Sequence, residues 1–147
     1  MGKDPIILAL EQQVECYRRL AKLAAVQHEH VQREQTEELL QVLGHRQEVL
    51  EQITRLERTL APVKKQWGTY AGRLDRAERA RAEAMLGETR ELLEQITTAD
   101  RNDALVLQQR KINLGRQINQ AAAAKQVNRN YAMAAYGTRR SSVDVQR

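Results

Sequence analysis

Few residues of this chain have the type and spacing that chemistry at a site requires. His28 and His30 flank Glu29 and form the densest group of metal-ligating side chains in the sequence. Residues two positions apart on a helix point about 200° away from each other, so these histidines cannot share one metal ion. The spacing of four that zinc proteases use is missing. We therefore expect both histidines at the surface or at the boundary of a core.

Other candidate catalytic groups are equally isolated. Cys16 is the only cysteine, so no disulfide can form within the chain, and a small half-buried thiol is its expected role. Trp67 and Tyr70 occupy apolar positions of a helical pattern, which is typical of a core rather than a cofactor site. No glycine-rich phosphate loop follows a strand. The sequence predicts a protein that is not an enzyme and that binds no cofactor and no metal.

The elements that would position any site are helices. From Val49, apolar residues recur at alternating steps of four and three, which is a heptad repeat that needs a facing helix. No alternating run indicates a sheet. The predicted fold class is all-α: an antiparallel three-helix, coiled-coil-like bundle with a long, overhanging C-terminal helix. The repeat comprises Val49, Ile53, Leu56, Leu60, Val63, Trp67, Tyr70 and Leu74.

Capping signals divide the chain into three segments. Asp4 is a candidate N-cap followed by Pro5 at the first helical position, and Thr36 is a second candidate N-cap. Asp75 and Glu78 have the spacing of a capping box. These signals predict helices over about residues 5–34, 37–72 and 75–135.

Two positions decide whether these helices are continuous. Pro62 is expected to kink the second helix without breaking it, because the heptad register continues past it. The third helix is expected to continue through residue 100 and to end at Gly137 as its cap. The sequence thus predicts one helical domain over residues 1–137 and a flexible tail over residues 138–147.

Charge is distributed unevenly along the chain. Residues 1–103 carry 16 basic and 18 acidic side chains, whereas residues 104–147 carry eight basic and one acidic. Such asymmetry is typical of a polyanionic or acidic partner, or of a solvated helix face. A nucleic-acid partner is disfavoured, because the cations are spread over five turns without an aromatic platform. No apolar run or signal segment indicates membrane insertion, so a cytoplasmic protein is expected.

The C-terminal part of the third helix has its own composition. From about residue 113, amides and alanines replace most large aliphatic residues, and Val127, Tyr131 and Ala134 share one face. Such a segment has little apolar area with which to pack on the bundle, and it is typical of a helix that meets a partner helix. Packing against the bundle, or against a second copy of the chain, is the alternative that the composition leaves open.

A pattern of coiled-coil positions over about residues 6–137 resembles a known family. It comprises the first helix, Leu39-Leu40, the run from His45 to Leu50 with Ile53, Leu60-Ala61-Pro62, the run from Leu92 to Ile96, the run from Asp100 to Asp103, and Tyr136-Gly137. This pattern resembles flagellar export chaperones of the FlgN type.

The resemblance implies a small cytoplasmic chaperone. Such a protein would bind hook–filament junction proteins through its C-terminal helix and deliver them to the flagellar type III export gate. An aromatic residue near the end of that helix, here Tyr131 or Tyr136, would dock to the gate. The alternative is a coiled-coil stalk or adaptor of the export apparatus, or another helical scaffold. The partner-binding residues that the resemblance implies are Leu114, Ile118, Val127, Tyr131, Met133 and Tyr136.

Overall fold

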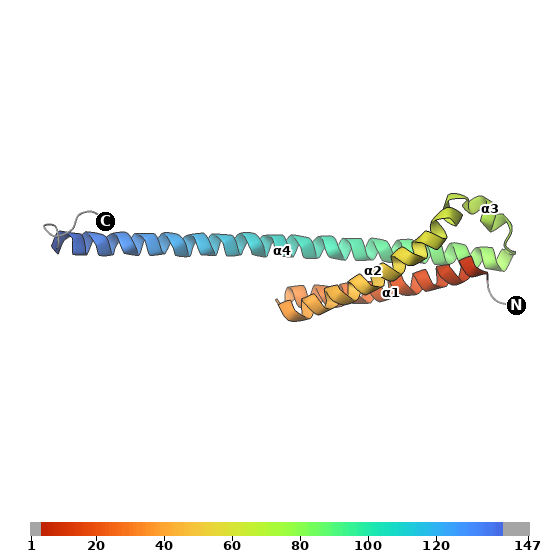
Figure 1. Cartoon of the computed structure of the whole chain (residues 1–147), viewed down its shortest axis with the longest axis horizontal. Helices are drawn as coiled ribbons and strands as arrows, with labels where there is room; N and C mark the ends of the chain where they lie inside the picture. The colour runs from red at the N-terminus through yellow and green to blue at the C-terminus, as the bar shows by residue number, and fades with distance from the viewer. Residues whose placement is uncertain (1–3, 140–147) are drawn as a thin grey trace. The chain divides into compact units, whose positions relative to one another are not determined.

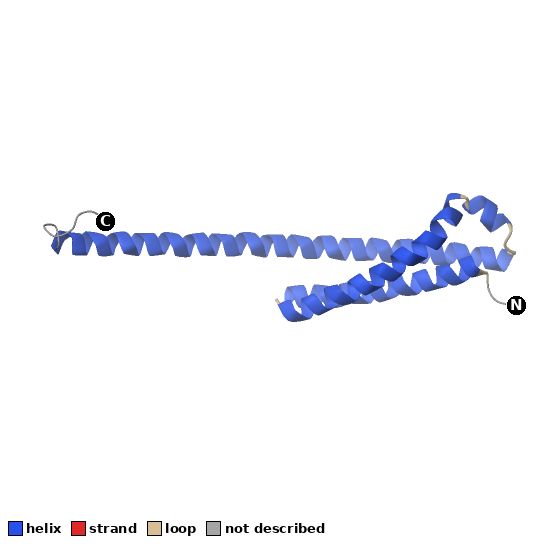
Figure 2. Cartoon of the chain, in the orientation of Figure 1, coloured by secondary structure: helices blue, strands red, loops and turns tan. Residues whose placement is uncertain are grey.

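The computed structural model describes the backbone of residues 4–139 and the side chains of residues 4–134. Its elements are α1 (Pro5–Gln32), α2 (Thr36–Lys65), α3 (Trp67–Gly72) and α4 (Arg76–Arg139), joined by short turns (Figure 1, Figure 2). No strand occurs within residues 4–139, so the all-α prediction with a long C-terminal helix is confirmed. The chain divides into an N-terminal unit, residues 1–105, and a C-terminal unit, residues 106–147, and the boundary falls within α4.

Helix α1 begins as its capping residues predict. The Asp4 carboxylate accepts a hydrogen bond from the Ile6 backbone N–H at 2.7 Å, and Pro5 is the first helical residue. This bond satisfies one of the backbone donors that a helix N-terminus leaves unpaired. Residues that adjoin one another in the sequence therefore define the start of α1.

The turn between α1 and α2 differs from the prediction. Glu34 has a φ of 57°, a left-handed backbone conformation that reverses the chain. Gln35 is the N-cap of α2 and Thr36 its first residue, so the prediction of Thr36 as N-cap is wrong. The Gln35 side chain does not cap the helix, because its Oε1 lies 2.7 Å from Nδ1 of His30 across the turn.

The helix predicted over residues 37–72 is two helices. α2 continues past Pro62 to Lys65, and the backbone leaves helical geometry at Gln66, with φ −120° and ψ 41°. The Gln66 N–H turns back to the Val63 carbonyl at 3.1 Å, which closes α2 with a tight turn. Pro62 does not break the helix, as predicted, but the prediction of one continuous helix to residue 72 is wrong, because the helix ends at Lys65 and a second one begins at Trp67.

Helix α4 starts at a cap and runs without interruption. The Asp75 carboxylate accepts from the Glu78 N–H at 2.7 Å, as the capping prediction requires. The helix continues through residue 100, which confirms the predicted continuity. It also continues through Gly137 to Arg139, so Gly137 is not its cap; no glycine among the described residues has a positive φ. Of the predicted tail, residues 140–147 lie outside the described residues.

The N-terminal unit is a bundle of α1, α2 and the first part of α4. α2 runs antiparallel to α1, because Gln13 pairs with Glu57 whereas Gln27 pairs with Arg46. The first part of α4 runs parallel to α1, and both helices lie along α2 in Figure 1. Two ion pairs, Glu11 with Arg81 and Arg18 with Glu88, and the contact of His28 with Asp103 mark this parallel alignment.

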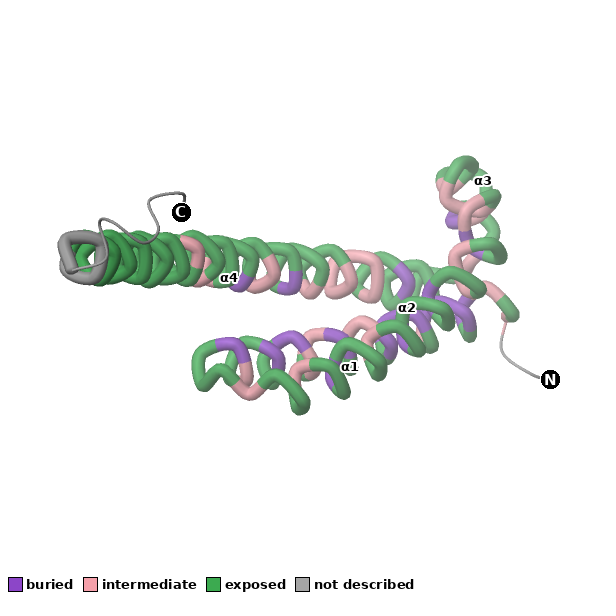
Figure 3. Tube along the Cα trace, turned by 60° about the vertical axis from the view of Figure 1, so that its left-hand side comes forward, coloured by how far each residue is buried: buried purple, intermediate pink, exposed green. Residues whose placement is uncertain are grey.

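The core of the N-terminal unit forms along these three helices (Figure 3). The heptad prediction holds through Leu60, since Val49, Ile53 and Leu60 are buried. Cys16 is fully buried rather than half-buried, and this burial raises the pKa of its thiol. One cluster contains Cys16, Leu20, Ala24, Val49, Ile53 and Ile96, and a second contains Ile7, Ala9, Leu10, Leu60 and Ala82.

Candidate partner-binding surface

The C-terminal unit exposes every predicted contact residue whose side chain is described. Residues 106–134 are helical, and all except Val106, Arg110 and Gly115 are exposed (Figure 3). Several large apolar side chains are among these exposed residues, so the faces of the helix that they share decide whether they form one interaction surface. Tyr136 lies in α4, and its side chain is outside the described residues. The exposed fractions are 57% for Leu114, 59% for Ile118, 49% for Val127, 72% for Tyr131 and 47% for Met133.

These predicted residues do not form one stripe. An α-helix turns about 100° per residue, so Ile118 lies about 40° around the helix from Leu114. Val127 and Tyr131 lie about 220° and 260° from Leu114, on the other side, and Met133 lies about 100° away. One partner helix cannot cover both sides at once. The predicted set therefore combines two faces of the same helix.

One of these faces, which we call the leucine face, consists of Leu107, Leu114 and Ile118. Leu107 lies seven residues before Leu114 and is 43% exposed, so the two side chains share a heptad position. The predicted set omitted Leu107. The seven-residue step between the two leucines is the signal that would have identified it. The leucine face has the spacing that a partner helix requires.

The other face, which we call the tyrosine face, consists of Val127 and Tyr131. Both side chains are exposed, and the neighbouring amides Gln126 and Asn130 bond to each other at 3.3 Å. A tyrosine combines a large apolar ring with a hydroxyl that hydrogen-bonds to a partner. This face is therefore suited to a small polar contact rather than to a long apolar seam.

The N-terminal unit contains a buried polar cluster that the sequence did not predict. The Arg46 guanidinium makes a bidentate pair with the Asp100 carboxylate, with both distances 2.7 Å, and also donates to Oε1 of Gln27. Asp103 is 2% exposed and accepts from Nε2 of Gln27 at 3.2 Å. Oδ1 of Asp103 lies 2.7 Å from Nδ1 of His28. Hydrogen bonding to Asp100 raises the pKa of Arg46.

This cluster connects the three helices of the bundle. Gln27 and His28 lie on α1, Arg46 on α2, and the two aspartates one turn apart on α4. The largely buried Arg46 side chain donates to Gln27 on one neighbouring helix and to Asp100 on the other, and this pairing favours one register of the three helices. His28 is exposed and contacts Asp103 at the edge of the bundle, as expected for a boundary histidine. We therefore infer that the cluster holds the three helices of the bundle in one alignment.

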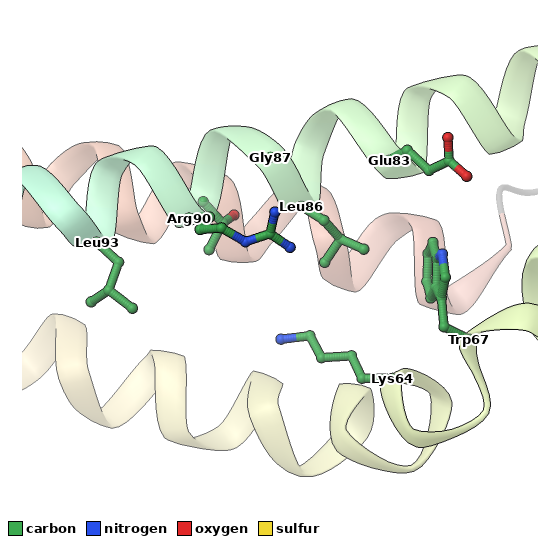
Figure 4. Close-up of a pocket in the computed structure, with 8 residues that line it drawn as sticks. Lys64, Trp67, Glu83, Leu86, Gly87, Arg90 and Leu93 are labelled. Atoms are coloured by element: carbon green, nitrogen blue, oxygen red, sulfur yellow. The ribbon is translucent and has the colours of Figure 1, made fainter.

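A shallow groove lies between the α2–α3 junction and α4 in the N-terminal unit (Figure 4). Its volume is about 590 Å³, and Trp67 and Leu86 lie close together in it. Nζ of Lys64 lies 3.1 Å from the Glu57 carboxylate, so this cation already has a partner. The groove is lined by Lys64, Trp67, Glu83, Leu86, Gly87, Thr89, Arg90 and Leu93.

Within the described part of the chain, no group of three or more His, Cys, Asp or Glu side chains is placed to hold a metal ion. No helix in the same residues is long and apolar enough to span a membrane. Comparisons with protein-family models, with curated proteins and with solved structures found no match to this chain. The exposed surface of α4 is therefore the feature on which a function is inferred.

Proposed function

We propose that this protein is a cytoplasmic flagellar type III export chaperone of the FlgN type. It binds hook–filament junction proteins through the C-terminal half of α4 and delivers them to the export gate. The observation that carries this proposal is the exposure of large apolar side chains along residues 106–134, above all at Leu114 and Ile118. An amphipathic helix binds a partner by placing such side chains against the apolar face of another helix.

The composition of this surface suits a carrier that must release its client. The three large apolar side chains of the leucine face are separated mainly by amide and cationic residues, so the apolar area buried in a complex is modest. Affinity depends on a few central anchors rather than on total area. Leu114 and Ile118 are the central pair. A client held by so few anchors dissociates readily once the export gate offers a competing site.

The helix also has a feature that favours the structural alternative. α4 is 64 residues long, a length that a stalk or adaptor would use. A stalk pairs along an uninterrupted heptad seam. Beyond Ile118, however, the positions that continue the leucine face are Ala121, Lys125 and Asn128. This seam is too weak for a self-sufficient stalk, so client binding is the better-supported function.

The test is binding of the full-length chain to a purified hook–filament junction protein, measured by isothermal titration calorimetry. Replacing Leu114 and Ile118 together by Asp is expected to weaken binding by more than about tenfold, because both anchors are lost. Leu40→Asp is the matched control, since Leu40 is 63% exposed in the N-terminal unit. Parent-like affinity of the double variant, or no affinity of the parent chain, contradicts the proposal.

Gate docking is tested separately at the two candidate tyrosines, Tyr131 and Tyr136. Tyr131→Ala and Tyr136→Ala are each expected to leave client affinity unchanged, and one of them is expected to reduce binding to the cytoplasmic domain of the export gate. A pull-down with that domain measures this. Gate binding that survives both substitutions contradicts the docking role.

A further inference from the structure

The leucine face carries charge as well as apolar side chains. Between residues 104 and 134 every charged residue is a cation, namely Arg110, Lys111, Arg116, Lys125 and Arg129. These residues are spread over several helical turns, yet most of their side chains project from the same side of the helix. In the continuous helix α4, all except Arg116 lie within about 60° of Leu114, whereas Arg116 lies about 200° away. Cations therefore flank the apolar seam on one side of the helix.

This arrangement differs from that of a surface built for solubility. A solvated helix face mixes both signs, and the first part of α4 does so, since its first two turns carry Arg76, Arg79 and Arg81 together with Glu78 and Glu83. The leucine face has no acidic neighbour between residues 104 and 134. Lys125 and Arg129 are four residues apart, so the two like charges oppose helix formation. A partner that brings carboxylates removes this repulsion.

We propose that the leucine face binds an acidic amphipathic helix, with aliphatic residues along its centre and Asp or Glu along both edges. This inference rests on the proposed function and specifies the chemistry of the client segment. In helix pairs, charges beside the apolar seam select the partner and its orientation. Lys111 lies beside the seam formed by Leu114 and Ile118, and Lys125 lies in line with this seam, seven residues beyond Ile118. A helix with aliphatic residues at its centre and carboxylates on its edges would contact both the apolar seam and the cations.

Two other occupants fit the face less well. A second copy of the same segment opposes cations with cations in either orientation, because the segment has no acidic residue to pair with them. A nucleic acid pairs with the cations but leaves Leu114 and Ile118 in water, and the leucine face has no aromatic ring on which a base can stack. The acidic helix alone uses both the charge and the apolar residues.

The test uses the full-length chain and a synthetic helical peptide of three heptads, with Leu at the seam positions and Glu at the flanking positions. A second peptide with Lys in place of Glu is the matched probe. Fluorescence anisotropy measures both affinities. The Glu peptide is expected to bind at least about tenfold more tightly than the Lys peptide at low salt, and this preference is expected to shrink as salt rises.

A charge swap on the protein tests the geometry. The double variant Lys111→Glu and Lys125→Glu is expected to lose at least about tenfold in affinity for the Glu peptide and to gain affinity for the Lys peptide. Arg116→Glu, on the other side of the same helix, is expected to stay within about twofold of the parent. Circular dichroism confirms equal helicity, and Lys111→Ala with Lys125→Ala replaces the double variant if helicity falls.

Several results would overturn the inference. Equal losses from Arg116→Glu and from the double variant show that the leucine face is not the site. Tighter binding to duplex DNA than to the Glu peptide makes a nucleic acid the occupant. A dimer in light scattering that Ile118→Asp dissolves makes a second copy the occupant.

The two proposals fail in different ways. Failure of the Glu peptide to bind, under conditions where the junction protein binds, refutes the acidic-helix inference and leaves the chaperone proposal standing. Binding of the Glu peptide, with no binding of the junction protein, refutes the chaperone proposal and leaves the partner chemistry standing.

Discussion

Ile96 and Leu114 lie on the same helix, yet their surroundings differ completely. Ile96 is 4% exposed and belongs to a core cluster with Leu20 and Val49, whereas Leu114 is 57% exposed. Both side chains have similar apolar area, and burying either one fully is worth about 2 kcal/mol. In the N-terminal unit this free energy stabilises the fold. In the C-terminal unit, the same free energy is gained only when a partner buries Leu114. Helix formation and side-chain burial are therefore separate properties of this chain.

Charge at buried and exposed positions gives the sharpest test of this contrast. Ile53→Asp is expected to destabilise the N-terminal unit by more than about 3 kcal/mol, because it places a carboxylate in the core between α1 and α2. Leu114→Asp, a matched change at an exposed position, is expected to leave the unfolding midpoint unchanged. Urea unfolding followed by circular dichroism measures both. Similar shifts for the two variants would show that the contrast between the units is wrong.

The polar cluster offers a second test, with a smaller effect. Arg46→Ala is expected to cost about 2 kcal/mol of unfolding free energy, because it leaves Asp100 and the Gln27 amide oxygen without their donor. Arg101→Ala, an exposed change between the two aspartates of the cluster, is expected to have almost no effect. Chemical denaturation measures the difference. A harmless Arg46→Ala would mean that the cluster does not hold the bundle together.

Acid dependence gives a third and weaker test. Hydrogen bonds from Arg18 lower the pKa of Glu88 below its ordinary 4.5. The contribution of this ion pair is therefore complete above about pH 4.5 and is lost as the pH falls through the lowered pKa. Arg18→Ala is expected to remove this part of the acid destabilisation. The effect is small because both side chains are about half exposed. Urea midpoints at neutral and acidic pH, with and without Arg18, measure it; identical acid profiles would contradict the assignment.

Truncation has the smallest expected effect on the bundle. A chain that ends at residue 112 retains all the buried residues of the N-terminal unit and both core clusters. Its unfolding midpoint is expected to match that of the full chain, whereas client binding is expected to disappear with Leu114 and Ile118. Thermal melting and a pull-down measure the two properties. A truncated chain that still captures the client would place the binding surface in the N-terminal unit.

The sequence predicted those features that depend on local periodicity. Val49, Ile53 and Leu60 were identified as core positions because a heptad spacing defines which side of a helix faces its neighbour. The caps at Asp4 and Asp75 were identified because a cap is made by residues two or three positions apart. The break at Gln66 was missed, since the heptad register continues across it even though the backbone does not.

Features that depend on long-range pairing could not be predicted in the same way. Arg46 and Asp100 are 54 residues apart, and Gln27 and Asp103 are 76 residues apart, so no spacing in the sequence marks them as partners. The common direction of Lys111 and Lys125, by contrast, follows from the continuous helix that the sequence predicted, but the prediction did not combine these cations with the apolar residues of the same face. The predicted contact residues whose side chains are described are exposed, and the prediction did not separate them into two faces.

The three-residue turn around Glu34 has a consequence for the order of folding events. α1 and α2 are consecutive, and the pairs that join them include Arg46 with Gln27, only 19 residues apart, whereas Arg18 meets Glu88 across 70 residues. Contacts that close short loops form sooner than contacts that close long ones. The α1–α2 hairpin is thus expected to fold first, during synthesis of the chain. The first part of α4 is then expected to pack against the hairpin that has already formed.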